Sequence, residues 1–214
     1  MRNKIGTFLM LCGVALVLAA LGLFLTNRRE AENAELQSAI LLPQLVEMAQ
    51  QEEIREETRL PEPEIPEELL TAEDVKMEEV EIDGHFYIGY LSMPTVELEL
   101  PIMSDWSYEK LTIAPCRYYG TLRGKDLVLL AHNYDRHFGR LNDLKVGDSV
   151  YFTEMDGTVT AYKVVARDIL DPHAVEEMTA GLYDLTLFTC TYGGQSRVTV
   201  YCDMDRTGAQ SIPG

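Results

Sequence analysis

The sequence predicts a mainly β fold for residues 80–205, a closed or nearly closed barrel, preceded by a transmembrane helix and an acidic stalk. Three observations support this architecture. A long uncharged apolar run lies near the N-terminus, a segment rich in Glu and Pro follows it, and a series of short β-branched and aromatic runs then alternates with turn signals.

The apolar run from Ile5 to Asn27 contains 23 residues without a formal charge. A helix that rises 1.5 Å per residue needs about 20 residues to cross the hydrocarbon core of a bilayer. The run exceeds the roughly 7–15 residues of a signal-peptide core. We therefore interpret residues 1–27 as a cytoplasmic tip and an uncleaved transmembrane anchor. Basic residues lie on both sides of the run, so the residues alone leave its orientation open.

Residues 28–79 are predicted to form the acidic stalk or linker. Apolar residues recur at helix-like intervals in the first part of this segment, and Pro43 interrupts the pattern. Two short helices are one interpretation, rising from the membrane or pairing with another copy. A solvated stalk is the favoured one. Residues 60–68 alternate proline with charge, which predicts a stiff, extended spacer.

Residues 80–205 carry the β pattern, and residues 206–214 form a C-terminal tail. An Asp-Gly pair at Asp156 and Gly157 indicates a hairpin between two strands. Residues 104–111 are interpreted as a short helix or a covering loop. The expected strands are His85–Met93, Thr95–Met103, Leu127–Ala131, Ser149–Thr153, Thr158–Ile169, Leu185–Cys190 and Arg197–Cys202.

The formal net charge of −17 argues against a nucleic-acid partner, because binding to phosphates depends on Lys and Arg, and no basic stripe interrupts the acidic composition. The chain has no Cys-x-x-Cys spacing, so a zinc cluster is unsupported. The acidic residues are spread over the whole chain and do not predict a calcium site. We expect neither a metal nor a cofactor.

Three reactive side chains are expected to meet at one rim of the barrel. Cys190 ends one strand, Arg197 begins the next, and His132 follows another apolar run. A thiol, an imidazole and a guanidinium at one site suit acyl transfer through a thioester. The alternative for Cys190 is a buried structural cysteine, which is common on strands. Alternation along the last strand predicts that Cys202 is a core residue.

The other cysteines bear on which thiol can react. Cys12 lies in the membrane segment. A disulfide between Cys116 and Cys202 is the only pairing that leaves Cys190 free. Nothing in the sequence shows that these two residues are close, so this possibility stays open.

The run Thr186-Leu187-Phe188-Thr189-Cys190 resembles the Thr-Leu-X-Thr-Cys signature of the sortases, membrane-anchored cysteine transpeptidases of mainly Gram-positive bacteria. The similarity extends over about residues 80–205. It includes the histidine that follows an apolar strand, the arginine after the cysteine, and the segment 87–94, which is similar to the family's first strand. The resemblance implies an eight-stranded barrel with Cys190 as nucleophile, His132 as acid and base, and Arg197 beside the oxyanion.

The resemblance also implies a substrate and partners. A sortase would cleave a Leu-Pro-X-Thr-Gly-like sorting signal of a surface protein and transfer the acyl group to an amine. That amine belongs to a peptidoglycan precursor of the cell wall or to a lysine of another surface protein. The catalytic domain would then lie outside the cell membrane. Side chains expected to contact the substrate are Thr189, which could instead serve only to pack its strand, His137, Glu176 and Glu177.

Departures from the family limit the subclass. Asp105 and Trp106 resemble the lid motif of pilin-polymerising sortases, but they follow the second strand, whereas that lid precedes the barrel. This position favours an anchoring or specialised small sortase. Two other classes of function remain as alternatives: a membrane-tethered cysteine peptidase with water as acceptor, and a non-catalytic surface-binding module in which Cys190 only packs.

Overall fold

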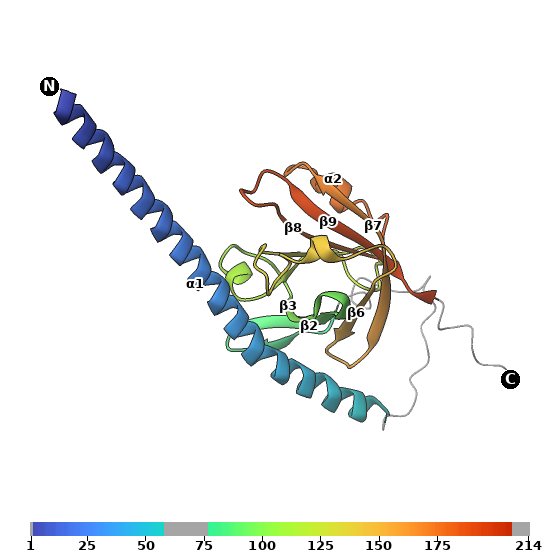
Figure 1. The fold of residues 1–214 in the computed structure, drawn as a ribbon. Helices are drawn as coiled ribbons and strands as arrows, with labels where there is room; N and C mark the ends of the chain where they lie inside the picture. The colour runs from blue at the N-terminus through green and yellow to red at the C-terminus, as the bar shows by residue number, and fades with distance from the viewer. Residues whose placement is uncertain (1, 58–76, 207–214) are drawn as a thin grey trace.

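A long helix and a β-barrel lie side by side in the computed structural model, which describes residues 2–57 and 77–206 (Figure 1). The helix α1 spans Arg2–Glu57, and the barrel packs beside its C-terminal half. Residues 6–55 lie in a helix that is long and apolar enough to cross a membrane, and the apolar part is not buried against the barrel. The predicted spacer at 60–68 lies outside the described residues, as does the predicted tail after Arg206.

Within the described residues, nine strands follow α1, and short helical segments connect some of them. The strands are β1 (Val80–Ile82), β2 (His85–Met93), β3 (Leu98–Met103), β4 (Cys116–Tyr119), β5 (Leu127–Ala131), β6 (Ser149–Glu154), β7 (Val159–Leu170), β8 (Leu185–Cys190) and β9 (Arg197–Met204). The helical segments are η2 (Pro94–Val96), η3 (Lys110–Thr112), η4 (Leu141–Asp143) and α2 (Val175–Met178).

Eight of these strands close into a barrel, as predicted. The strand order is β1-β2-β3-β4-β5-β8-β9-β7-β6, and an additional antiparallel pairing of β2 with β6 closes the ring. β1 lies outside the ring as a hairpin partner of β2. Closure pairs the edge strands of an open sheet with each other. The three strands whose ends carry or precede the predicted site residues, β5, β8 and β9, are neighbours in this ring.

The side chains of the strands divide between two buried clusters. Leu185 and Leu187 of β8 belong to the cluster inside the barrel, whereas Phe188 belongs to a second cluster on its outer face. This division follows from the two-residue period of a strand. Cys202 lies in the inner cluster, so its predicted place in the core is confirmed.

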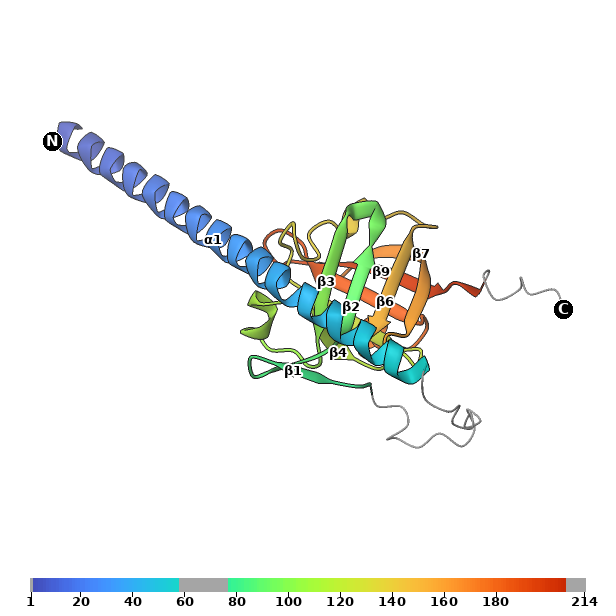
Figure 2. The ribbon, with the colours of Figure 1, turned by 90° about the horizontal axis from the view of Figure 1, so that it is seen from below.

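α1 packs its C-terminal half against the barrel. Its buried residues recur three or four positions apart, which places them on one face of a helix. That face contacts β2, β3 and η3, and Figure 2 shows the helix crossing β3 and β2. Residues 34–49 of α1 are therefore docked on the barrel over one face, while the acidic side chains of Glu35 and Glu47 remain exposed. The buried residues are Ala34, Ser38, Leu41, Leu45 and Ala49.

The interpretation of two short helices is wrong, because α1 continues through Pro43. The favoured interpretation, a solvated stalk, does not hold for the buried face of α1. A proline inside a helix costs about 3 kcal/mol, since it removes a hydrogen bond and crowds the preceding turn. Burial of Leu41 and Leu45 contributes roughly 1.5–3 kcal/mol each and offsets that cost. The helix bends where it runs along the barrel, in the half that contains Pro43 (Figure 1).

Turn chemistry explains two further boundaries. The predicted hairpin between β6 and β7 is confirmed, with the Thr158 amide donating to Oδ1 of Asp156 over 2.8 Å. The strand expected to begin at Thr95 begins later, at Leu98, because residues 94–96 form η2. Glu97, which has φ of 53°, ends η2 in the left-handed conformation and separates it from β3.

Candidate active site

Three neighbouring strands bring the predicted catalytic residues to one edge of the barrel. β5 and β8 are parallel with Ala131 opposite Thr189, so the next residues, His132 and Cys190, are also neighbours. β8 and β9 are antiparallel, and Cys190 lies directly opposite Arg197. Adjacent strands are about 4.8 Å apart. The cysteine is therefore flanked by the histidine on one side and the arginine on the other.

The register also places the three side chains on the outer face of the barrel. Cys190 shares its face with Phe188, a member of the outer cluster. Val198 and Val200 point into the barrel, so Arg197 points outward. His132 continues the outward positions of β5, one residue beyond the strand. All three side chains are half-buried, which leaves the site open to a substrate.

The loop after β5 holds the backbone of His132. The His132 carbonyl accepts a hydrogen bond from the Phe138 amide at 3.1 Å, and the Phe138 ring is fully buried inside the barrel. Gly139 donates to the Tyr134 carbonyl at 2.9 Å. A Cβ atom on Gly139 would approach the carbonyl oxygen of Asn133 to 2.6 Å, so a glycine is required at this position. The loop is coiled tightly enough to fix the histidine.

The turn between β8 and β9 fixes the arginine. Gly193 and Gly194 have φ angles of 85° and 72°, a conformation that L side chains rarely adopt. Nη1 of Arg197 donates to the carbonyl oxygens of Gly194 and Ser196, each at 3.2 Å. The guanidinium therefore rests on the turn beside Cys190 and keeps further N–H donors for another acceptor.

Burial sets the charge state of the two histidines in this loop. It lowers the pKa of His132, while the carboxylate of Glu30 acts in the opposite direction. Burial lowers the pKa of His137 to about 4, and the neighbouring His132 lowers it as well. The backbone of Ile113 acts in the opposite direction. His137 is fully buried, and neither ring nitrogen has a well-aligned hydrogen-bond partner. His137 is thus neutral near pH 7, and a substrate contact by it would require the loop to move.

The other cysteines differ from Cys190 in their surroundings. Burial raises the pKa of Cys116 to about 12 and raises that of Cys202 further. Both thiols are free, and they belong to different clusters, one outside and one inside the barrel. Cys12 lies in the apolar part of α1. Cys190 is the half-exposed thiol of the barrel, and thiolate chemistry needs such access.

The remaining predicted site residues lie around this edge. Thr189 is buried, and its hydroxyl donates to the Ala131 carbonyl at 2.8 Å, which ties the ends of β5 and β8 together. Glu176 and Glu177 are exposed in α2, on the loop between β7 and β8. The start of that loop lies beside the site because Leu170 pairs with Arg197. In the described part of the chain, no group of His, Cys, Asp or Glu side chains could hold a metal ion.

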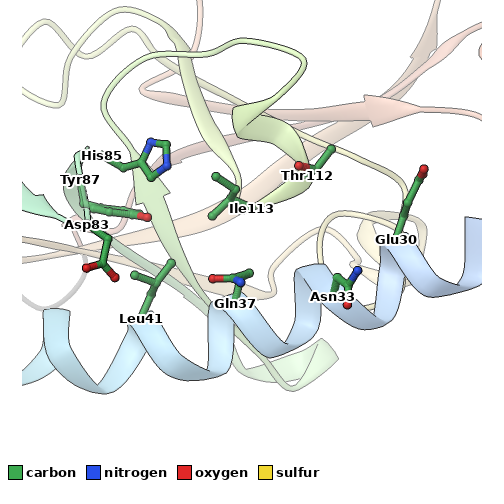
Figure 3. A pocket seen from close by; sticks show the side chains of 9 residues that line it. All are labelled: Glu30, Asn33, Gln37, Leu41, Asp83, His85, Tyr87, Thr112 and Ile113. Atoms are coloured by element: carbon green, nitrogen blue, oxygen red, sulfur yellow. The ribbon is translucent and has the colours of Figure 1, made fainter.

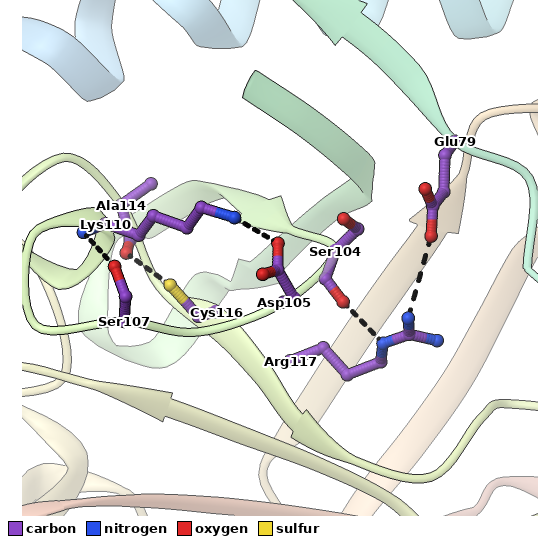
Figure 4. A network of polar contacts seen from close by, with 8 residues as sticks. All are labelled: Glu79, Ser104, Asp105, Ser107, Lys110, Ala114, Cys116 and Arg117. Carbon is purple, nitrogen blue, oxygen red and sulfur yellow. Dashed lines mark hydrogen bonds and ion pairs between the residues drawn. The ribbon is translucent and has the colours of Figure 1, made fainter. Parts of the chain in front are cut away.

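The loop between β3 and β4 forms a wall on the outer face. Trp106 packs on Tyr118 with ring centroids 5.6 Å apart, and Tyr118 contacts Phe188 edge to face at 5.3 Å. Asp105 forms an ion pair with Lys110, and the neighbouring Ser104 is contacted by Arg117 (Figure 4). Trp106 therefore begins a series of aromatic contacts that runs through Tyr118 to Phe188, two residues before Cys190, while Asp105 ties the same loop to Lys110.

Figure 4 also shows how this wall is fastened. Nε of Arg117 donates to the Ser104 carbonyl at 2.6 Å, and its Nη2 lies 3.6 Å from the Glu79 carboxylate. Ser107 accepts a hydrogen bond from the Lys110 amide at 3.1 Å. These contacts fix both ends of the segment that carries Trp106.

Two residues beside the site were missed by the sequence analysis. Tyr134 packs against His132, with ring centroids 4.9 Å apart, and its hydroxyl donates to the carboxylate of Glu30 at 3.5 Å. Glu30 lies 104 positions earlier in the chain. No local pattern could indicate a contact over that separation, because it depends on how α1 docks on the barrel.

Comparisons with known proteins agree with this architecture. The family model described as the Sortase domain matches residues 91–205. Sortase C1 of Streptococcus suis is 28% identical over 59% of this chain and 76% of its own, with a TM-score of 0.51. Sortase C of Streptococcus pneumoniae is 23% identical, with 79% and 89% covered and a TM-score of 0.51.

A lid mutant of sortase A from Corynebacterium diphtheriae is 20% identical, with 78% of this chain and 95% of its own covered, and a TM-score of 0.51. The last two structures are less than 25% identical to this chain, so their similarity supports the fold and no shared activity. Among curated proteins, none matches the chain.

Proposed function

Because this chain belongs to the sortase family, we propose that it is a cysteine transpeptidase in which Cys190 is the nucleophile, His132 the acid and base, and Arg197 the oxyanion donor. One observation carries this assignment. The end of β8 lies between the end of β5 and the start of β9, so the cysteine has the histidine on one side and the arginine on the other. A cysteine that served only to pack would not need these neighbours.

The proposed reaction has two halves. The Cys190 thiolate attacks a backbone carbonyl and forms a C–S bond, and the oxyanion is stabilised by N–H groups of Arg197. The C–N bond then breaks, and the His132 imidazolium gives its proton to the departing amine. In the second half, neutral His132 takes a proton from the acceptor amine as that amine attacks the thioester. The thiolate and the imidazolium are regenerated.

The surroundings of His132 fit these proton transfers. Burial lowers its pKa, which favours the neutral imidazole that the second half requires. The Glu30 carboxylate acts against burial and supports the imidazolium that the first half requires. A minor thiolate–imidazolium population can then carry the first step.

The proposed substrate is a surface protein with a Leu-Pro-X-Thr-Gly-like sorting signal. The peptide would approach Cys190 beside Trp106 and Tyr118, which pack outside the buried Phe188. A cavity of about 670 Å³ adjoins Trp106 and Tyr118. Glu176 and Glu177 on α2 are candidate contacts for the peptide, and Thr189 supports the strand ends beneath it. The acceptor is an amine of a peptidoglycan precursor or of a protein lysine.

A product assay tests this proposal. The full chain in detergent micelles or nanodiscs is incubated with a library of sorting-signal peptides, with and without an added amine, and products are identified by mass spectrometry. We expect cleavage between Thr and Gly and, with the amine, a ligated acyl product. Hydrolysis alone at every amine concentration would identify a peptidase instead. No cleavage of any peptide, with no thioester on the protein, would contradict catalysis.

We also propose that α1 anchors the chain in the cell membrane and that the barrel lies outside the cytoplasm. The apolar part of α1 is exposed. The proposed substrates are surface proteins, which lie on the outer side of the cell membrane. Protease added to intact protoplasts is expected to degrade the barrel while a cytoplasmic marker protein survives. Protection of the barrel until the cells are lysed would reverse the orientation.

A further inference from the structure

α1 contacts the loop that carries the proposed catalytic histidine. The Glu30 carboxylate accepts a hydrogen bond from the Tyr134 hydroxyl at 3.5 Å. About one turn further along the helix, Glu35 forms an ion pair with Arg136 at 3.1 Å. Both helix residues are acidic, and both partners lie within four residues of His132. The helix therefore holds this loop at two points.

Tyr134 lies between Glu30 and His132. Its side chain is 8% exposed and packs on the imidazole with ring centroids 4.9 Å apart. The ring also contacts His137 at 5.6 Å. A shift of Tyr134 would therefore displace both imidazoles. The hydroxyl that bonds to Glu30 is the polar end of a ring that is otherwise buried, so the bond fixes the ring's orientation.

Two cavities border this contact. One, of about 640 Å³, is lined by Glu30, Thr112 and Ile113 among others, and Figure 3 shows Glu30 on α1 at the end nearest Thr112. The other, of about 350 Å³, lies between α1, the loop at Tyr134 and the exposed Tyr192 of the β8–β9 turn. The helix thus contacts the loop on the His132 side and faces the turn on the Arg197 side across the second cavity.

The charged and titratable groups around His132 come from four elements. α1 contributes Glu30, and the loop itself contributes Tyr134, the neutral His137, Asp135 and Arg136, whose guanidinium pairs with Glu35 of α1. The strand ends contribute Cys190 and Arg197. The segment at Thr112 and Ile113, which lines the cavity beside Glu30, brings no ionisable side chain. Among the carboxylates nearby, Glu30 is the one that acts on the charge of His132, whereas Glu35 pairs with Arg136.

We propose that Glu30 is a positioning residue of the active site, which orients His132 through Tyr134 and stabilises its imidazolium form. This proposal rests on the proposed function. It means that α1, which lies outside the barrel, contributes to the active site at the barrel's edge.

The sign of the effect follows from charge. A carboxylate near an imidazole favours its protonated form, so Glu30→Gln is expected to lower the pKa of His132. The thiolate–imidazolium population would then fall. In transpeptidation assays, the acid limb of the pH profile of kcat/KM is expected to move to lower pH. Its plateau is expected to fall about two- to fivefold, the range for an exposed ion pair. A change that only loosened packing would lower the plateau without moving the limb.

The direct test is a titration by NMR of the full chain in micelles, labelled with ¹³C-histidine. The His132 signal is identified by its loss in His132→Gln. We expect a lower His132 pKa in Glu30→Gln, a near-normal one in Glu30→Asp, and a smaller decrease in Tyr134→Phe. Glu32→Gln is the matched control, because Glu32 is an exposed acid on the same helix that pairs with Arg28 at 2.8 Å.

A His132 pKa that is the same in Glu30→Gln as in Glu32→Gln would overturn the proposal. The titration needs no turnover, so it remains decisive if the peptide assays fail. A lowered pKa in a chain without transpeptidase activity would support the role of Glu30 and refute the proposed function. If the His132 pKa in Glu30→Gln equalled that of the wild type and the enzyme had transpeptidase activity, the role of Glu30 would be refuted and the proposed function supported.

Discussion

Cys190→Ala is expected to abolish both cleavage of the sorting-signal peptide and formation of the thioester, with a loss of more than about 10⁴-fold in kcat. In the proposed mechanism the Cys190 sulfur bonds to the substrate, and no neighbouring side chain can replace it. The substitution removes one half-buried sulfur at the end of β8, so the barrel should remain folded. Intact-protein mass spectrometry should detect the acyl-enzyme in the wild type and none in the variant.

The matched controls are the buried cysteines. Cys116→Ala and Cys202→Ala should retain thioester formation even where they lower the melting temperature, because both thiols are buried and have raised pKa values. Turnover by Cys190→Ala within tenfold of wild type would refute the mechanism. Loss of the thioester in Cys116→Ala with an intact fold would show that the nucleophile was misassigned.

Arg197→Ala is expected to lower kcat by about 10²–10³-fold, the usual loss when one oxyanion donor is removed. The guanidinium donates to carbonyl oxygens of the β8–β9 turn at its own strand end, so the melting temperature should change little. Arg197→Lys should restore only part of the rate, because an ammonium keeps the charge and loses the planar arrangement of donors. Steady-state kinetics and thermal unfolding together check these expectations.

A charge control is available on the next strand. Arg167 is exposed on β7 and donates to the Asn142 carbonyl, away from Cys190. Arg167→Ala removes the same charge and should leave kcat within about twofold. If Arg197→Ala also stayed within a factor of about three of wild type, Arg197 would have no part in the chemistry.

Local patterns were sufficient to predict most of the barrel. Alternation and turn signals indicated the strands, the Asp156-Gly157 hairpin and the inward position of Cys202, because each depends on neighbours in sequence. The boundaries of the apolar runs also indicated that His132, Cys190 and Arg197 lie at strand ends. The pairing of β2 with β6, which closes the ring, joins segments about 60 residues apart and has no local signal.

The course of α1 could not be predicted for a related reason. Pro43 argues locally for a helix end, and only the packing of Leu41 and Leu45 on the barrel reverses that preference. The same docking creates the contact between Glu30 and Tyr134. The acidic composition of the segment masked its buried face, which consists of five residues spaced along the helix. Features that depend on tertiary packing were therefore the ones missed around the site.

Because β8 lies inside a closed ring, the segments around it can change in evolution more easily than β8 itself. Both edges of β8 are hydrogen-bonded, to β5 and to β9, so the backbone beneath the nucleophile has little freedom to adapt. The walls beside it, the segment with Trp106 and the segment with α2, are connections whose length and side chains can vary without breaking a strand pair. New peptide preferences can thus arise by substitution in these connections while the reacting atoms keep their geometry.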